Sequence, residues 1–405
     1  MILFLYRFGG KLPYPLFEKY KNSIESFSNE KVFLLEYSSL HLSYGRRGME
    51  ENIINCIERN NIRICIFSMK TFDFDLEFLK RLRKRNFIVL YNTDDEVRYE
   101  FVSKTYAQLA DFVVTHDYAS INKFQQIGLD TFFNPLPYSR NDYYPLPDIK
   151  KTVDVSFLGK ISKVGRKESL DFIRSKCINI ETFGSGEGLK YLRHEEVVKL
   201  YNESKINLNF TGVGGNFNWY SKYDPTFKRT RQIKGKPVQV LLTKSFLLSE
   251  YVPFLEKVFE IGKEIDVFYN KEDLLHKIEY YLKNEDLREE IASRGYERAI
   301  RYYEMDALWK NILNSIMESY NKVNWEERKF DDIQVFVGET FKKNYATFRF
   351  WYIAQLIIHK KYKHIFRELR DVYKMGRFRP VEAIKFFSPV VKHFLGDRDY
   401  RSVKE

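Results

Sequence analysis

The sequence is poor in cysteine, proline and long apolar runs, and each shortage excludes a class of protein. Its 405 residues include 3 Cys and 11 Pro. The cysteines, Cys56, Cys65 and Cys177, stand singly, so we expect buried thiols in a reducing compartment and neither disulfides nor a zinc site. No apolar run approaches the roughly 20 residues of a membrane-spanning helix. The apolar start precedes Arg7, the reverse of a secretory signal, which predicts a cytoplasmic protein.

The positive charge of the chain is concentrated at one end. The formal net charge is +12, and residues 340–405 carry 16 Lys and Arg against 6 Asp and Glu. The rest of the chain is therefore nearly neutral, and the basic character belongs to a C-terminal segment. A neutral body without a recognition motif argues against nucleic acid as a partner.

Short apolar runs alternate with longer amphipathic segments, a pattern typical of βα units around parallel sheets. The first series predicts strands at 2–6, 32–36, 62–67, 87–91 and 112–115. A proline-dense stretch, 133–148, separates it from a second series, with strands at 153–158, 178–183, 206–210, 245–249 and 258–261. We predict two doubly wound α/β domains, 1–145 and 146–320, and a basic helical extension, 321–405. Two such sheets in tandem predict a cleft between the domains, where ligands bind at the carboxyl ends of strands.

Glycines and cations follow three successive strands of the predicted second domain. They are Gly159, Lys160, Arg166, Lys167, Gly184, Ser185 and the glycines within 211–215. Glycine lets the backbone approach a ligand closely, and cations at a helix N-terminus neutralise a diphosphate. A basic surface turn is the alternative for the first of these loops. Three permissive loops at one sheet edge favour a phosphate-binding site.

Several segments in the same order resemble one known family. They are 200–210, Gln232-Ile-Lys-Gly-Lys236, 246–251, 262–265 and 294–298, with Thr93-Asp-Asp-Glu-Val-Arg-Tyr99 in the first domain. Together they resemble the CgeB-like (spore-maturation-type) glycosyltransferases. The likeness covers roughly residues 60 to 305 and leaves out the C-terminal extension.

The resemblance implies a GT-B architecture of two Rossmann-like domains. It also implies sugar transfer from a UDP- or GDP-sugar, with no metal and no tightly bound cofactor. Lys234 and Lys236 match the positions whose charge stabilises the departing diphosphate, and Lys236 aligns with the usual basic residue. The chain departs from the family at Gln239, where relatives commonly carry glutamate. A neutral amide accepts hydrogen bonds from ribose hydroxyls more weakly than a carboxylate.

Asp94, Asp95 and His116 are the candidates for proton chemistry, because each closely follows a predicted strand of the first domain. Adjacent side chains on an extended segment point opposite ways, so Asp94 and Asp95 cannot both bind or deprotonate an acceptor hydroxyl. Turn and capping roles are the alternatives, and Asp117 is as well suited to cap the next helix. The leading hypothesis is a glycosyltransferase acting on a glycan, lipid-linked or protein acceptor. The alternative, motivated by Gln239, is a catalytically silent scaffold that binds nucleotide or glycan.

The C-terminal extension combines an aromatic run, 341–358, with a basic cluster of Lys360, Lys361, Lys363, Arg367 and Arg370. Aromatic side chains beside cations suit an interfacial helix on an anionic membrane, which would bring the chain to a lipid-linked acceptor. The alternative is a helix packed on the body of the protein or on another subunit, with its charges in water.

Overall fold

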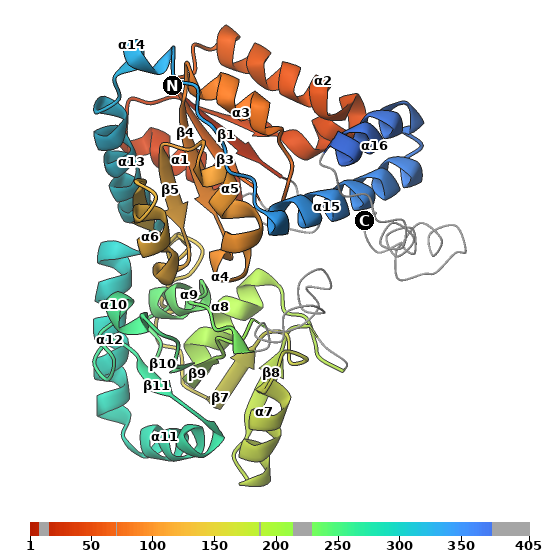
Figure 1. Cartoon of the computed structure of the whole chain (residues 1–405). Coiled ribbons are helices and arrows are strands. Elements are labelled where there is room, and N and C mark those ends of the chain that lie inside the picture. The colour runs from red at the N-terminus through yellow and green to blue at the C-terminus, as the bar shows by residue number, and fades with distance from the viewer. Residues whose placement is uncertain (8–15, 70, 186–187, 214–228, 375–405) are drawn as a thin grey trace. The chain divides into compact units, whose positions relative to one another are not determined.

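The computed structural model describes residues 1–7, 16–69, 71–185, 188–213 and 229–374. The chain divides into two compact units. The first comprises 1–115, 120–132 and the segment from 312 onward, and the second comprises 116–119 and 133–311. Each unit is a sheet flanked by helices (Figure 1). Helices α6 (Tyr118–Gln125) and α13 (Met305–Asn321) contain residues of both units.

The first unit is built on a six-stranded sheet in the order β2-β1-β3-β4-β5-β6, and the pairs from β2 to β5 are parallel. Its strands are β1 (Ile2–Tyr6), β2 (Val32–Glu36), β3 (Ile64–Ser68), β4 (Phe87–Asn92), β5 (Phe112–Thr115) and β6 (Asp130–Phe133). Its other helices include α1 (Leu16–Phe27), α2 (Tyr37–Arg59), α3 (Leu76–Arg83), α4 (Asp95–Arg98), α5 (Lys104–Ala107) and α14 (Trp325–Arg328). The predicted strands 2–6, 32–36 and 112–115 are confirmed.

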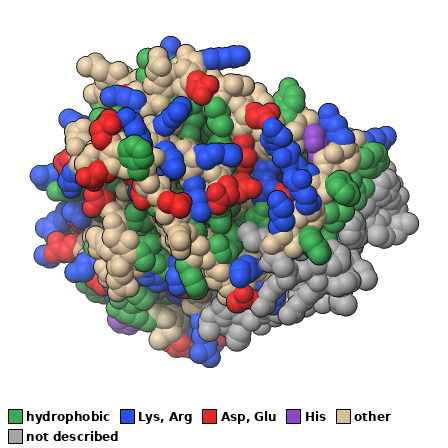
Figure 2. Space-filling model, turned by 45° about the horizontal axis from the view of Figure 1, so that its top comes forward, with side chains coloured by type: hydrophobic (Ala, Val, Ile, Leu, Met, Phe, Trp, Pro, Cys, Tyr) green, Lys and Arg blue, Asp and Glu red, His purple; other side chains and the backbone are tan. Residues whose placement is uncertain are grey.

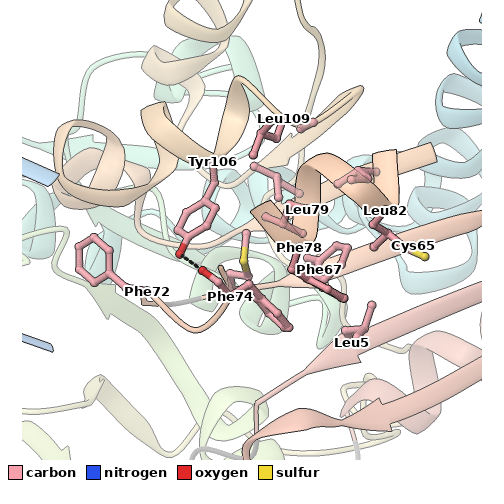
Figure 3. Close-up of a cluster of buried hydrophobic side chains, with 14 of the residues drawn as sticks. Leu5, Cys65, Phe67, Phe72, Phe74, Phe78, Leu79, Leu82, Tyr106 and Leu109 are labelled. Carbon is pink, nitrogen blue, oxygen red and sulfur yellow. Dashed lines mark hydrogen bonds between the residues drawn. The ribbon is translucent and has the colours of Figure 1, made fainter. Parts of the chain in front are cut away.

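Aromatic side chains make up a large part of the core of the first unit (Figure 3). Phe67 and Phe74 pack edge to face with ring centroids 5.1 Å apart, and Phe74 stacks on Phe78 at 6.0 Å. The buried Tyr106 hydroxyl donates to the Phe74 carbonyl oxygen at 2.8 Å, which satisfies a polar group that would otherwise lose its water. These contacts fasten α3 and α5 to the sheet.

Helix α15 (Glu339–Ile358) belongs to this core and carries the aromatic run of the extension. Four of its aromatic side chains are buried in the hydrophobic core of the first unit: Phe341, Tyr345, Phe348 and Tyr352. Burying each such ring stabilises a fold by about 1.5–3 kcal/mol, so α15 is held as part of the first unit. The packed alternative therefore describes α15 better than the interfacial one. In the described ranges, no helix is long and apolar enough to cross a membrane.

The second unit has a five-stranded sheet in the order β11-β10-β9-β7-β8, all parallel. Its strands are β7 (Val153–Leu158), β8 (Ile180–Phe183), β9 (Ser204–Asn209), β10 (Leu247–Glu250) and β11 (Asp266–Phe268). Its helices are α7 (Arg166–Ser175), α8 (His194–Glu203), α9 (Lys236–Leu242), α10 (Leu255–Val258), α11 (Lys271–Lys283) and α12 (Glu285–Tyr302). The prediction of two doubly wound α/β domains is confirmed, as is a helical C-terminal region.

Two expectations are wrong in detail. The strand expected at 258–261 is absent: α10 ends at Val258, and the fifth strand is β11. Val258 and Phe259 are buried although they are not in a strand, and Gly262, with φ +81°, turns the chain just before β11. Of the three cysteines, Cys65 is buried and Cys56 is partly buried, but Cys177, in the loop after α7, is exposed.

Candidate functional site

The site is built at the carboxyl edge of the second unit's sheet. Strands β10, β9, β7 and β8 are neighbours in that order and all run parallel, so their following loops meet at one edge. Residues Gly159, Gly184 and Gly212 lie in three of these loops, as the sequence predicts. Gly214 and Gly215, at the end of the third, lie outside the described residues.

The loops after β7 and β8 touch through their backbones. The Gly159 amide donates to the Phe183 carbonyl oxygen at 2.8 Å. A Cβ on Gly184, whose φ is +123°, would lie 2.6 Å from the Gly159 oxygen. No side chain fits there without moving backbone, so glycine at 184 is required by packing as well as by conformation.

Three cationic side chains converge beside these glycines; we call Arg166, Lys234 and Lys236 the cationic edge. Arg166, the first residue of α7, donates to the carbonyl oxygens of Phe210 at 3.2 Å and Gly212 at 3.1 Å. Lys234 donates to the same Gly212 oxygen at 2.8 Å. The two cations thus share the loop after β9.

Lys236 completes the cationic edge from the first position of α9. Its ammonium donates to the Leu158 carbonyl oxygen at the end of β7 and lies 4.6 Å from the centroid of the Phe157 ring. Carbonyl oxygens and a ring face hold these cations without cancelling their charge. Lys234 and Lys236 both keep partly exposed side chains, so a ligand can reach them.

The electrostatics of the cationic edge favour an anionic ligand. Burial, followed by the positive charges of Arg166 and Lys163, lowers the pKa of Lys236 to about 7. The same causes, with Lys236 added, lower the pKa of Lys234 to about 6. Burial lowers the pKa of Arg166 to about 10. The negative charge of a diphosphate bound here would favour the protonated forms of these groups and so raise their pKa values.

Glu250, at the end of β10, holds the loop after β9 in place. One of its carboxylate oxygens accepts from the backbone amide of Thr211 at 2.8 Å and that of Gly212 at 3.3 Å, and the other accepts from Arg231 at 3.0 Å. This clamp aims the Gly212 carbonyl at the cationic edge. Sequence reasoning missed it, although the signal was available: a carboxylate ending the strand next to a glycine-containing loop.

Gln239 lies on α9, one turn beyond Lys236. Its side-chain oxygen accepts from the Tyr201 hydroxyl at 3.4 Å, and Tyr138 also hydrogen-bonds its side chain. Tyr138 packs against Gly235 as well, since a Cβ there would lie 2.6 Å from the tyrosine ring. The amide that differs from the family pattern is therefore oriented by two tyrosines.

The other predicted binding residues lie farther from this centre. Lys160 contributes its carbonyl oxygen, which accepts from Arg166 at 3.1 Å, while its side chain is partly exposed. The side chains of Lys167 and Ser185 are exposed. The structure thus brings Arg166, Lys234 and Lys236 together and leaves Lys167 on the surface of α7.

The acidic pair after β4 divides into an inner and an outer carboxylate. Asp95 has no exposed surface and accepts from Ser103 at 2.5 Å and Thr115 at 2.6 Å, so it ties α4 to β5. A base must come within hydrogen-bonding reach of an acceptor hydroxyl, so burial makes Asp95 the less accessible carboxylate of the pair. Asp94 precedes α4 and has a φ of +64°. Its side chain is 28% exposed, and its carboxylate lies 3.8 Å from the Arg98 guanidinium.

His116 is almost fully buried, at 3% exposure, and its ring lies 3.4 Å from the Asn134 side chain. Asp117 accepts from the Ala119 backbone amide at 3.2 Å at the start of α6, which is the capping role expected as an alternative for it.

Comparison with known proteins agrees with this fold. Residues 166–314 match the model of a family described as glycosyl transferase-like, a match that includes the whole cationic edge. Among curated proteins, no sequence matches the chain.

Solved structures of glycosyltransferases with the GT-B fold are similar to the chain. Sucrose-phosphate synthase from Thermosynechococcus elongatus shares 9% identity at a TM-score of 0.58, covering 80% of this chain and 99% of that one. Anabaena HepE, solved with UDP and glucose, shares 13% identity at a TM-score of 0.53, covering 78% and 99%. A glycosyltransferase from Rickettsia africae shares 10% identity at a TM-score of 0.51, covering 80% and 99%. The chain therefore has the GT-B fold, and membership of the CgeB-like subfamily stays a prediction.

Proposed function

We propose that this chain, with its GT-B fold, transfers a sugar from a nucleoside diphosphate donor to a hydroxyl of a glycan, lipid-linked or protein acceptor. The observation that carries the proposal is the cationic edge: Arg166, Lys234 and Lys236 meet carbonyl oxygens beside two glycine loops. Such a group of cations is suited to the two negative charges of a diphosphate ester. The family match across 166–314 supports the same assignment.

The chemical role follows from where charge develops. When the bond between the sugar and the diphosphate breaks, negative charge grows on the leaving oxygen. Fixed cations that already face that position stabilise the charge without reorganising, and they can do so without a metal ion. Lys236 is the proposed main contributor because it opens α9, where the helix N-terminus adds its own positive dipole.

Proton acceptance from the acceptor hydroxyl is assigned to Asp94. It is the carboxylate of the acidic pair that keeps exposed surface, whereas Asp95 is proposed to position α4. His116 remains a second candidate for proton transfer, with much less exposed surface. A lipid-linked acceptor would place the chain on the cytoplasmic side of a membrane.

The donor is proposed to be a UDP- or GDP-sugar. Uridine nucleotides should be tested first, because HepE was solved with UDP and glucose. Isothermal titration of the full chain with UDP, GDP and their sugars tests the proposal. Lys236→Met is expected to weaken binding at least tenfold at pH 6.5, where the lysine is largely charged. Lys199→Met is the matched control, because Lys199 is an exposed lysine of the same unit on α8. Wild-type protein that binds none of these nucleotides would overturn the proposal.

A silent nucleotide- or glycan-binding protein is the second candidate, because the side-chain oxygen of Gln239 is engaged by Tyr201. A turnover assay distinguishes the transferase from the silent binding protein. Release of free sugar or its transfer from a UDP- or GDP-sugar, lost in Lys236→Met, supports the transferase; nucleotide binding without either reaction supports the silent protein.

A further inference from the structure

Helix α16 (Ile365–Lys374) presents two different faces, and its inner face is anchored in the first unit. Val372 is fully buried with Ile353 of α15, and Ile365 packs against the same small cluster. Glu368, with 1% of its surface exposed, accepts from Arg349 at 3.2 Å. The spacing of 365, 368 and 372 keeps these residues on one side of the helix. The orientation of α16 is therefore fixed by packing.

The outer face of α16 carries an apolar stripe. Phe366 and Tyr373 are each 81% exposed and Leu369 is 38% exposed. Their spacing of three and four residues aligns them along the helix, and each follows a residue of the buried stripe, so the two stripes lie about 100° apart around the helix axis. A single large apolar side chain is ordinary on a protein surface. Two aromatic rings and a leucine aligned on one solvated face are unusual, and such a set marks an interaction site.

Within α16 itself, the exposed charges are of one sign. Both acidic residues of α16 are turned inward, where Glu368 pairs with Arg349 and Asp371 pairs with Arg46. The cations point to solvent: Lys360, Lys363, Arg370 and Lys374 are exposed and Lys361 and Arg367 are partly exposed. Figure 2 shows Lys and Arg side chains gathered beside hydrophobic ones on the right of the molecule, where Figure 1 places α15 and α16.

We propose that the outer face of α16 docks on an anionic lipid bilayer. The stripe of Phe366, Leu369 and Tyr373 would enter the boundary between headgroups and acyl chains, and the flanking cations would meet lipid phosphates. Leu369, at the centre of the stripe, favours hydrocarbon over a nucleic acid, since bases stack on aromatic planes and gain little from an aliphatic side chain. The proposed membrane contact therefore lies on α16 and not on residues 341–358, which are packed in the core of the first unit. This inference is independent of the sugar transfer proposed above.

Sedimentation of the full chain with lipid vesicles tests the proposal. We expect binding to vesicles containing phosphatidylglycerol and none to pure phosphatidylcholine. The double variant Phe366→Ser/Tyr373→Ser should lower the partition by about tenfold or more, because two rings no longer leave water. Phe330→Ser is the matched control: Phe330 is 85% exposed, in the same unit and outside α16, so its loss should leave the partition unchanged. Circular dichroism melting should be the same for all three proteins.

Two further variants test the contribution of the cations to membrane binding. Arg370→Gln and Lys374→Gln should each lower the partition by about fivefold, and the effect should fade at high salt. Equal sedimentation of wild type and the double variant would overturn the proposal, as would absence of binding to anionic vesicles. Binding of a single-stranded oligonucleotide that is lost in the double variant, with vesicle binding unaffected, would assign the stripe to nucleic acid instead.

Discussion

Affinity for a nucleotide sugar should fall as pH rises, and the cationic edge sets the size of the effect. The pKa of Lys236 is about 7 and that of Lys234 about 6, because burial and neighbouring positive charge disfavour their protonated forms. A bound diphosphate favours the protonated forms and raises both pKa values. Binding therefore takes up protons, and it weakens where the free protein has lost them.

The magnitude follows from the pKa of Lys236. Its protonated fraction falls from about 0.9 at pH 6 to about 0.1 at pH 8, so this residue alone weakens binding by about tenfold over that range. Lys234, with the lower pKa, adds to the fall in the same direction. A sugar ester of UDP is the right ligand, since its diphosphate carries no group that titrates in this range.

The assay is titration calorimetry at several pH values in buffers of different ionisation enthalpy, which also counts the protons taken up. Lys236→Arg is the matched variant, because guanidinium stays charged throughout and should remove the Lys236 part of the slope. Affinity that is constant from pH 6 to pH 8, or that rises with pH, would refute the reasoning.

Three further changes test other parts of the account. Gly184→Ala should lower the free energy of unfolding by about 2 kcal/mol more than Gly188→Ala does, because both glycines have a positive φ but only the Cβ at 184 would meet backbone, 2.6 Å from an oxygen; urea titration compares them. Arg349→Met should cost about 3–5 kcal/mol by the same assay, since it removes the arginine from a buried ion pair and leaves the Glu368 carboxylate with the His41 ring at 3.4 Å. Gln239→Glu should tighten UDP-sugar binding by about fivefold if the ribose hydroxyls reach residue 239, and unchanged affinity would place them elsewhere.

The two sheets could be predicted well because parallel strands buried on both faces are nearly continuous apolar runs. Strands β1, β2, β5 and β7 begin and end where those runs do. The stretch 258–261 is also mostly apolar, but its first residue is the last of α10, a helix that begins after Phe254, whose φ is +71°. Such a backbone choice depends on tertiary packing, which a local pattern does not contain.

The candidate site could be predicted in its residue types and less well in its geometry. Glycines and lysines after strands pointed to the right edge of the second sheet. Which cations converge is decided by three-dimensional contacts: Arg166 and Lys234 share the Gly212 carbonyl, while the side chain of Lys167 is exposed. The same limit applied to Asp94 and Asp95, where alternation predicted one inner and one outer side chain without saying which was which.

The central claim is that the cationic edge holds the diphosphate of a nucleotide sugar, and a crystal structure of the full chain with a UDP- or GDP-sugar tests it most directly. The account predicts diphosphate oxygens within hydrogen-bonding distance of Lys236 and of Arg166 or Lys234, beside Gly159. A nucleotide bound with its diphosphate away from all three cations would contradict it.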